Sequence, residues 1–352
     1  MVRQLRYFEA LREAQAQLLA TDPRTYVVGL GVPGPTGVFG TTKGLQEEFG
    51  AHRVLDMPSS ENAMTGIALG TALMGKRPIM VHMRVDFAVL AMEPLVNQAA
   101  KWHYMYGGKL RAPLTVRMII GRGWGQGPQH SQSLQAWFAH VPGLKVVMPT
   151  TPHDAKGMLI AAARDDAPVI VFEHRWLYGI SGPVPEDLYE VPLDKAAIVR
   201  PGRDVTLAAT SYMTLESLRA AELLAKIGIE AEVVDLRSIA PIDAATLVES
   251  VSRTRRLIVS DTGQASFGVG AEVIAAVSER AHGLMDAPPQ RIGLPHVPTP
   301  TTAALADLYY PLARDIAAAA LRSLGSNREL PPDAPDRRKW KDVPDSSFTG
   351  PY

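Results

Sequence analysis

The sequence predicts an α/β protein with two consecutive domains, and three observations lead to that class. Short β-branched runs alternate with amphipathic stretches of helical length, which is typical of parallel sheets covered by helices. The length of 352 residues suits two domains of ~100–200 residues each. A segment rich in proline, glycine and charge, residues 179–204, interrupts the alternation. We therefore expect a first domain over 1–185, a linker over 186–204, a second domain over 205–325 and an extended tail over 326–352.

The first domain is expected to open with an amphipathic helix, because Leu5, Phe8, Leu11 and Leu18 recur at helical spacing. Strand-like runs follow at 25–28, 78–83, 113–120, 145–148 and 168–172. Helical stretches lie between most of them, at 63–74, 88–102 and 152–163. This order predicts a parallel sheet with helices on its faces.

The second domain repeats the pattern on a smaller scale. Its strands are expected at 205–210, 230–236, 256–261 and 291–294, and its helices at 212–227, 244–251, 269–280 and 303–324. The tail beyond Gly325 is rich in proline and mixed charge, so we expect it to be extended or disordered and to dock Trp340, Phe348 or Tyr352 on a neighbour.

Composition excludes several classes of protein. Lys+Arg and Asp+Glu both number 36, so no global charge favours nucleic acid or an anionic membrane. The chain has no cysteine, which excludes a disulfide scaffold, a thiolate metal site and a cysteine nucleophile. No run is long and apolar enough for a membrane span, and Glu9 and Glu13 argue against a transit peptide. We expect a soluble, cytoplasmic protein.

A glycine motif directly after the first strand matches the spacing of a dinucleotide-binding site but not its context. Gly29, Gly31 and Gly34 satisfy the dinucleotide-binding spacing, and Asp56 lies at a suitable distance beyond them. That motif requires a helix to start within the glycines, whereas prolines and further glycines delay helical periodicity until about Leu45. A glycine-rich loop at the carboxyl end of a strand is the better interpretation, and it can still border an active site.

Three residues are candidates for chemistry, and each has a plainer alternative. Glu61 follows Ser59 and Ser60 at the start of a helix, where it is either a functional carboxylate or an ordinary first-turn acid. His130 lies in a glycine-rich loop, where it is either an acid–base group or a histidine bonded to backbone. Phe87 would ordinarily be a core residue.

Taken together, the sequence blocks resemble a family. RVLDMPSSENAMTGIALGTALMGKRPI, GQGPQHSQS, FAHVPGLKVVMPTTPHDAKGML, VVDLRSIAPID and GVGAEV occur in an order similar to that of the β subunit of thiamine-diphosphate-dependent 2-oxo acid dehydrogenases, the E1 component. The resemblance runs from about residue 4 to residue 324. It implies a pyrimidine-binding domain followed by a transketolase C-terminal-type α/β domain.

The resemblance also implies roles for particular residues. Glu61 matches the glutamate that bonds the aminopyrimidine of thiamine diphosphate, and Phe87 matches the aromatic residue packed against that ring. His130 matches a histidine that handles protons and assists acyl transfer to a lipoyl arm. Backbone carbonyls near Ala162, Ala163 and Asp165 would form a potassium site, although Ala167 replaces the usual polar residue there.

One absence implies a partner. The GDG motif that binds Mg²⁺ and the diphosphate belongs to the α subunit of this family, and this chain lacks it. We therefore expect an α2β2 heterotetramer in which the α subunit holds Mg²⁺, with a lipoyl acyltransferase core as a further partner.

Two departures from the family alter the expected site. Leu30 and Gly31 replace a usual acidic pair. Arg84 stands where a small or apolar residue is common, so it either reaches a substrate anion or is a surface or interface arginine.

The expected reaction is oxidative decarboxylation of a 2-oxo acid with transfer of the acyl group to lipoyl. Two alternatives remain: a split transketolase-like or acyloin-forming subunit with a carbonyl acceptor, and a noncatalytic scaffold. Retention of Glu61, Phe87 and His130 together argues against the scaffold.

Overall fold

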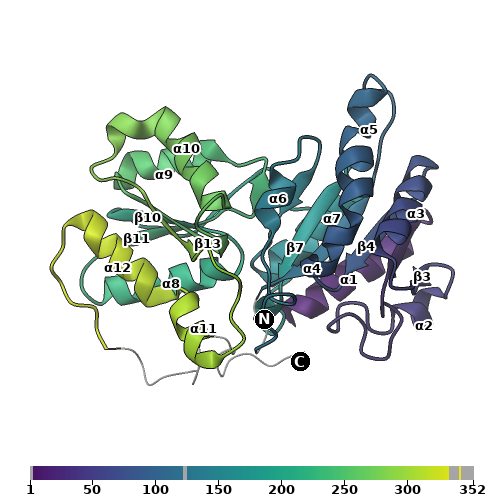
Figure 1. Ribbon diagram of the computed structural model, residues 1–352, viewed down its shortest axis with the longest axis horizontal. Helices are drawn as coiled ribbons and strands as arrows, with labels where there is room; N and C mark the ends of the chain where they lie inside the picture. The colour runs from purple at the N-terminus through teal and green to yellow at the C-terminus, as the bar shows by residue number, and fades with distance from the viewer. Residues whose placement is uncertain (1–2, 122–124, 333–340, 342–352) are drawn as a thin grey trace. The chain divides into compact units, whose positions relative to one another are not determined.

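The computed structural model describes residues 3–121, 125–332 and 341, which form two compact units (Figure 1). The first unit comprises the described residues within 1–120 and 137–193, and the second comprises those within 121–136 and 194–346. The segment 121–136, which lies inside the expected first domain, packs with the second unit. Each unit is described by itself below.

The first unit is built on a parallel sheet with the strand order β6-β7-β5-β4-β2-β3. Its strands are β2 (Thr25–Gly29), β3 (Val54–Leu55), β4 (Arg77–His82), β5 (Thr115–Ile120), β6 (Lys145–Val147) and β7 (Val169–His174). The five long runs predicted for this domain are thus confirmed as strands, with ends shifted by one or two residues. A separate antiparallel pair joins β1 (Gln4–Arg6) to β8 (Ser181–Pro183).

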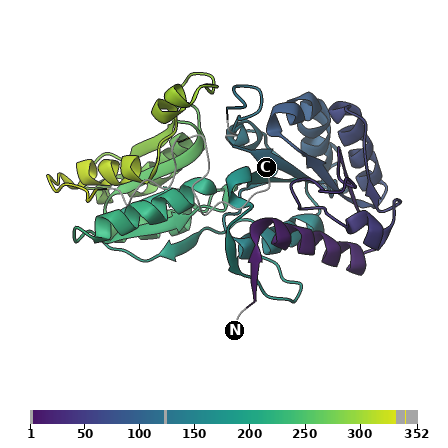
Figure 2. The same ribbon diagram turned by 90° about the horizontal axis from the view of Figure 1, so that it is seen from below.

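Helices cover both faces of this sheet. Helices α1 (Tyr7–Thr21) and α7 (Pro152–Arg164) pack together on one face, and α3 (Glu61–Leu73) and α5 (Ala100–Met105) lie on the other (Figure 2). The short α2 (Leu45–Phe49) precedes β3, and α6 (Gln135–Ala139) begins at the end of the segment 121–136.

The helix expected over 88–102 is divided into several turns. It runs through α4 (Val85–Ala88), a 3₁₀ turn at Val89–Ala91, a π-helical stretch at Glu93–Ala99 and then α5. Pro94 lies in the first turn of the π-helical stretch, where its missing N–H removes a regular helical hydrogen bond. The break therefore has a local cause in the sequence.

A charged pair lies inside the first core. Arg117 on β5 is fully buried and donates to both carboxylate oxygens of Glu173 on β7, at 2.5 and 2.8 Å. Arg117 also donates to Gln15 at 2.9 Å, and the Tyr178 hydroxyl donates to Glu173 at 2.8 Å. Every charge in this cluster has a partner, so removing one member would leave a buried charge, at a cost of ~3–5 kcal/mol.

The second unit contains a sheet with the order β14-β13-β10-β11-β9, in which only β9 is antiparallel to its neighbour. Its strands are β9 (Ala197–Arg200), β10 (Val205–Ala209), β11 (Ala231–Asp235), β13 (Leu257–Gln264) and β14 (Gln290–Leu294), and β12 (Ser238–Ala240) follows β11. Helices α8 (Tyr212–Ala225) and α12 (Ala313–Leu324) lie on one face, and α9 (Ala244–Thr254) and α10 (Val269–Ala281) on the other (Figure 1).

The expected helix over 303–324 is two helices, α11 (Ala303–Tyr309) and α12, because Pro311 separates them. The first residues of the tail pack on this unit: Leu330 lies against its core, and Arg328 donates to the Ile227 carbonyl at 2.6 Å. Trp340, Phe348 and Tyr352 lie outside the described residues. Among the described helices, none is long and apolar enough to cross a membrane.

Candidate functional site

The carboxyl edge of the first sheet carries several of the residues that the sequence singled out. In open parallel α/β sheets, ligands bind beyond the carboxyl ends of the strands. The glycine-rich loop follows β2 at this edge, Asp56 follows β3, Arg84 follows β4 and Arg175 follows β7. Helices α3 and α4, which carry Glu61 and Phe87, also begin here.

The glycine-rich loop is not a dinucleotide fingerprint, as expected. Residues 30–44 form successive turns, and the next helix starts only at Leu45. Asp56, the candidate ribose ligand of that motif, instead accepts the backbone N–H groups of Gly31 at 2.8 Å and Met57 at 2.9 Å. Its carboxylate therefore ties two loops of the edge together.

Glu61 is the first residue of α3, and its side chain is half-buried. Ser60 occupies the N-cap position, but its hydroxyl makes no capping bond. Within the described part of the chain, no hydrogen bond or ion pair involves the Glu61 carboxylate. A carboxylate at this position is favoured by the helix dipole and remains available to a ligand.

Phe87 is 41% exposed, which does not fit an ordinary core residue. The Asn62 amide donates to the Leu90 carbonyl at 3.2 Å, so the start of α3 is bonded to the turn that follows α4. Glu61 and Phe87 thus lie on two elements that are tied to each other directly beside these residues.

Behind these residues, His82 at the end of β4 is buried and contacts Thr65 of α3, with 3.1 Å between Nε2 and Oγ1. Burial lowers the pKa of His82 to about 4. His82 is therefore neutral near neutral pH and joins the base of α3 to the sheet.

Two arginines approach each other at this edge. Arg84 is the N-cap residue of α4, and Arg175 is a 3% exposed residue that follows β7. Burial and the nearby charge of Arg84 lower the pKa of Arg175 to about 9. The Arg175 guanidinium also lies over the Phe39 ring, 5.4 Å from its centroid.

The sequence indicates Arg84 as a candidate site residue but does not indicate Arg175. The only available signal was a basic residue directly after a buried strand, and one such residue does not reveal that a second arginine lies near it.

His130 belongs to the second unit, in the segment 121–136. It is half-buried, and its backbone N–H donates to the Gly127 carbonyl at 3.4 Å. The structure thus brings Glu61, Phe87 and Arg84 together on one unit and describes His130 within the other.

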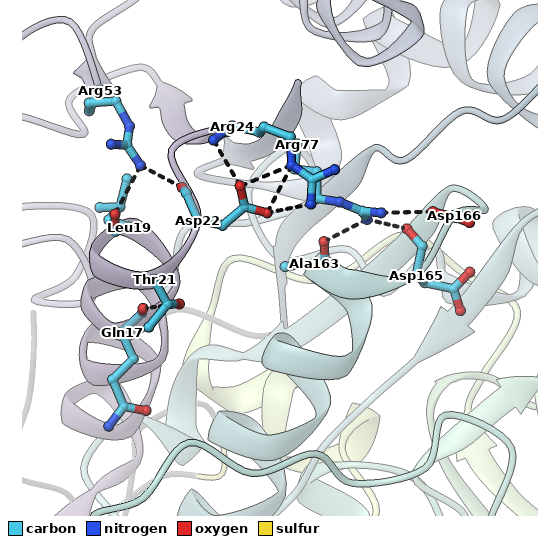
Figure 3. A network of polar contacts seen from close by, with 10 residues as sticks. All are labelled: Gln17, Leu19, Thr21, Asp22, Arg24, Arg53, Arg77, Ala163, Asp165 and Asp166. Atoms are coloured by element: carbon cyan, nitrogen blue, oxygen red, sulfur yellow. Dashed lines mark hydrogen bonds and ion pairs between the residues drawn. The ribbon is translucent and has the colours of Figure 1, made fainter. Parts of the chain in front are cut away.

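The region expected to hold potassium contains a guanidinium (Figure 3). Arg77 donates to the carbonyl oxygens of Ala163 at 3.1 Å and Asp165 at 3.0 Å, and to the Asp166 carboxylate at 2.7 Å. The Asp165 carboxylate bonds Lys145 and the Ala167 N–H. Potassium would have to share two oxygens with a positive charge, so these residues fit it poorly.

Two cavities lie at the amino edge of the same sheet, away from the strand ends described above. The larger, of ≈ 530 Å³, includes Asp22, Arg24, Arg77 and Arg164 in its lining, and the smaller, of ≈ 280 Å³, includes Arg24, Arg77 and Trp102. Neither lining includes Glu61, Phe87, Arg84 or His130, and the larger one includes Ala163 of the expected potassium region. Among the described residues, no group of three or more histidine and acidic side chains could hold a metal ion.

Comparison with known proteins agrees with the fold. The transketolase pyrimidine-binding domain family matches residues 3–180, and the transketolase C-terminal domain family matches residues 194–316. A solved structure described as a split-gene transketolase, inactive β4 tetramer, is similar with a TM-score of 0.75 and 25% identity, covering 92% of this chain and 99% of its own. The chain is therefore a transketolase-like protein with both domain types.

Curated relatives are more specific. The β subunit of acetoin:2,6-dichlorophenolindophenol oxidoreductase from Cupriavidus necator is 43% identical over 334 residues, covering 92% of this chain and 98% of its own length. The mitochondrial pyruvate dehydrogenase E1 β subunit from Chaetomium thermophilum is 43% identical over 322 residues, covering 89% and 84%. The chain belongs to the family of thiamine-diphosphate-dependent 2-oxo acid dehydrogenase E1 β subunits and is thus an enzyme subunit.

Proposed function

We propose that this chain supplies half of an E1 active site that decarboxylates a 2-oxo acid and transfers the acyl group to a lipoyl arm. The observation that carries the proposal is the Glu61 carboxylate, which makes no hydrogen bond or ion pair within the described residues, on a helix bonded to the turn that follows the exposed Phe87. A scaffold protein has no need of this combination. Family membership supports the same reaction class.

The residues at this edge fit thiamine diphosphate. The cofactor supplies, when bound, a nucleophilic carbon and an electron sink for the loss of CO2. Glu61 is suited to accept a hydrogen bond from the aminopyrimidine, because its carboxylate lies in the first turn of α3 and makes no hydrogen bond or ion pair within the described residues. Phe87 presents a large apolar ring that would fix the plane of a heterocycle and exclude water from one side of it.

Two further side chains have proposed roles toward the substrate. Arg84 would bind a substrate anion, and the repulsion between its charge and that of Arg175 favours an anion near the pair. His130 would hold or move a proton during acyl transfer, since an imidazole can do both near neutral pH.

We further propose that an α subunit completes the site in an α2β2 assembly and holds Mg²⁺. The exposed face of α3 supports a partner: a Cβ added at Gly66 or Gly70 would meet nothing within 4 Å, and Ile67 beside them is 56% exposed. The residues described here leave that face of α3 open. A lipoyl acyltransferase core remains a proposed further partner.

The proposal is tested by producing the chain with the GDG-bearing subunit and supplying thiamine diphosphate and Mg²⁺. We expect turnover of a 2-oxo acid with a lipoyl acceptor and little with an aldehyde acceptor. Turnover with the aldehyde alone would favour the split transketolase-like reaction. Calorimetric titration of the isolated chain is expected to show weak cofactor binding, and tight stoichiometric binding would contradict a shared site.

A further inference from the structure

The segment that carries His130 is fixed to the second unit by a buried polar chain. Asp261 lies on β13 and is 3% exposed, and its Oδ1 accepts hydrogen bonds from the Thr210 hydroxyl at 2.6 Å and the Gln135 amide at 2.8 Å. The same amide nitrogen lies 3.2 Å from the Thr262 hydroxyl. Gln135 stands at the end of the segment 121–136, so its side chain joins the segment to β13.

Glycines allow the segment to approach this closely. A Cβ on Gly263 would lie 3.0 Å from the Gln135 amide nitrogen and 3.3 Å from the Ser133 carbonyl oxygen. A Cβ on Gly127 would lie 2.7 Å from the Thr301 hydroxyl, at a backbone φ of +71°. The Gly121 N–H donates to the Gln132 carbonyl at 3.2 Å and closes the loop that contains His130. The loop is thus closed at its base, and at Gly127 and Gly263 the backbone lies too close to neighbouring groups to leave room for a side chain.

Burying the Asp261 carboxyl group costs free energy of folding, because a charge is less stable away from water. Burial raises the pKa of Asp261, which shows that the site disfavours its charged form. Hydrogen bonds from Thr210, Gln135 and the backbone of Thr262 and Gly263 oppose that rise, and the buried Oε1 of Gln135 has no hydrogen-bond partner within the described part of the chain. An apolar pair would avoid both costs but would lack directional bonds, and directional bonds are what orient a loop.

We propose that Asp261 and Gln135 are positioning residues that hold the His130 loop in its working conformation. Asp261 does not touch the reacting atoms in this proposal; it orients Gln135, which fixes the end of the loop. The kinetic part rests on the proposed role of His130 in acyl transfer. The structural part, that these bonds order the loop, does not depend on that role.

The experiment measures both parts. Gln135→Ala, Asp261→Ala and Gly263→Ala are compared with Ser217→Ala, a control that removes a different buried hydrogen bond of the same unit, the 3.0 Å contact with Ser260. Hydrogen exchange of the full chain should rise within residues 125–134 in the three test variants and stay unchanged in the control. Unchanged exchange in all three would overturn the proposal.

In the assembled enzyme, acyl transfer to lipoyl should fall ~10- to 100-fold in the test variants, because small displacements of an active-site group cost rates of this size. Decarboxylation followed with an artificial electron acceptor should stay within about threefold, provided that His130 acts after that step. Asp261→Asn keeps an acceptor oxygen and should restore transfer. An equal fall in both half-reactions, or failure of this rescue, would overturn the positioning role. If His130→Ala itself leaves transfer intact, the proposed function fails, while the exchange result still decides the anchoring.

Discussion

The two edges of the first unit's sheet use charged residues in opposite ways. At the amino edge, Arg53 and Arg77 donate to backbone carbonyls, and Arg24 pairs with Asp22 (Figure 3). At the carboxyl edge, the Glu61 carboxylate has no such bond in the described structure, and the charges of Arg84 and Arg175 oppose each other.

The difference lies in the bonds that each residue makes within its own chain. A guanidinium bonded to several carbonyls replaces the water it loses on burial, so it stabilises the chain that contains it. The Glu61 carboxylate makes no such bond among the described residues, and the charge of Arg84 disfavours the charged form of Arg175. Substitutions at the two edges should therefore change different measurements.

The largest expected effect is at the carboxyl edge. With the α partner present, Glu61→Ala should reduce exchange of the cofactor's C2 proton by ~100- to 10,000-fold, because the carboxylate that activates the aminopyrimidine is lost. The unfolding temperature and the assembly should remain unchanged, since Glu61 makes no described bond to its own chain. Exchange rates measured by NMR would check this, and normal exchange would assign activation to another group.

Low pH should destabilise the fold beneath the same edge, where His82 is buried. The pKa of His82 is about 4 in the folded chain and ordinarily about 6.5, so the fold favours the neutral imidazole. Its contribution is complete above pH 6.5 and is lost as the pH falls toward 4, by roughly 3 kcal/mol in all. Denaturant unfolding between pH 7 and pH 4 would measure this loss, and His82→Gln should reduce it. If the free energy of unfolding of that variant depends on pH as in the unsubstituted protein, other groups cause the acid sensitivity.

At the amino edge, Arg77→Met should lower the free energy of unfolding by ~1–3 kcal/mol, because the side chain is 14% exposed and bonds two carbonyls and a carboxylate. Arg24→Met is the matched control: that side chain is 56% exposed and makes a local ion pair, so its loss should cost less than ~1 kcal/mol. Both variants should keep full activity. Repeating the unfolding in potassium and in choline chloride would show whether a small cation replaces the guanidinium.

The smallest expected effect is on substrate binding. Arg84→Gln should lower kcat/KM for the 2-oxo acid about tenfold, the size of one charge-assisted contact to an anion. Exchange of the cofactor's C2 proton should stay unchanged, because Arg84 has no proposed role in that step. Equal kcat/KM in the variant would place Arg84 outside the substrate site.

Much of the fold followed from local patterns. The runs at Thr25–Gly29 and Val169–His174 are strands because β-branched residues repeat between turn signals, and the glycine loop after β2 lacks a helix because prolines interrupt it. The position of Glu61 at a helix start is also a local pattern, because Ser59 and Ser60 directly precede the helix. The long helical stretches at 88–102 and 303–324 are divided in the structure, because Pro94 and Pro311 interrupt the regular helical hydrogen bonds.

The sequence by itself determined the order of most strands and helices, the position of Glu61 at a helix start, and the family. Only the tertiary structure decided which distant side chains act on each other: the charge of Arg84 on Arg175, Gln135 on Asp261, and Arg77 on the carbonyls of α7 and its following turn. The physical reason is the distance along the chain over which each kind of interaction acts. Propensity and periodicity act between near neighbours in the chain, whereas a buried charge is stabilised by whichever groups the packed fold brings to it.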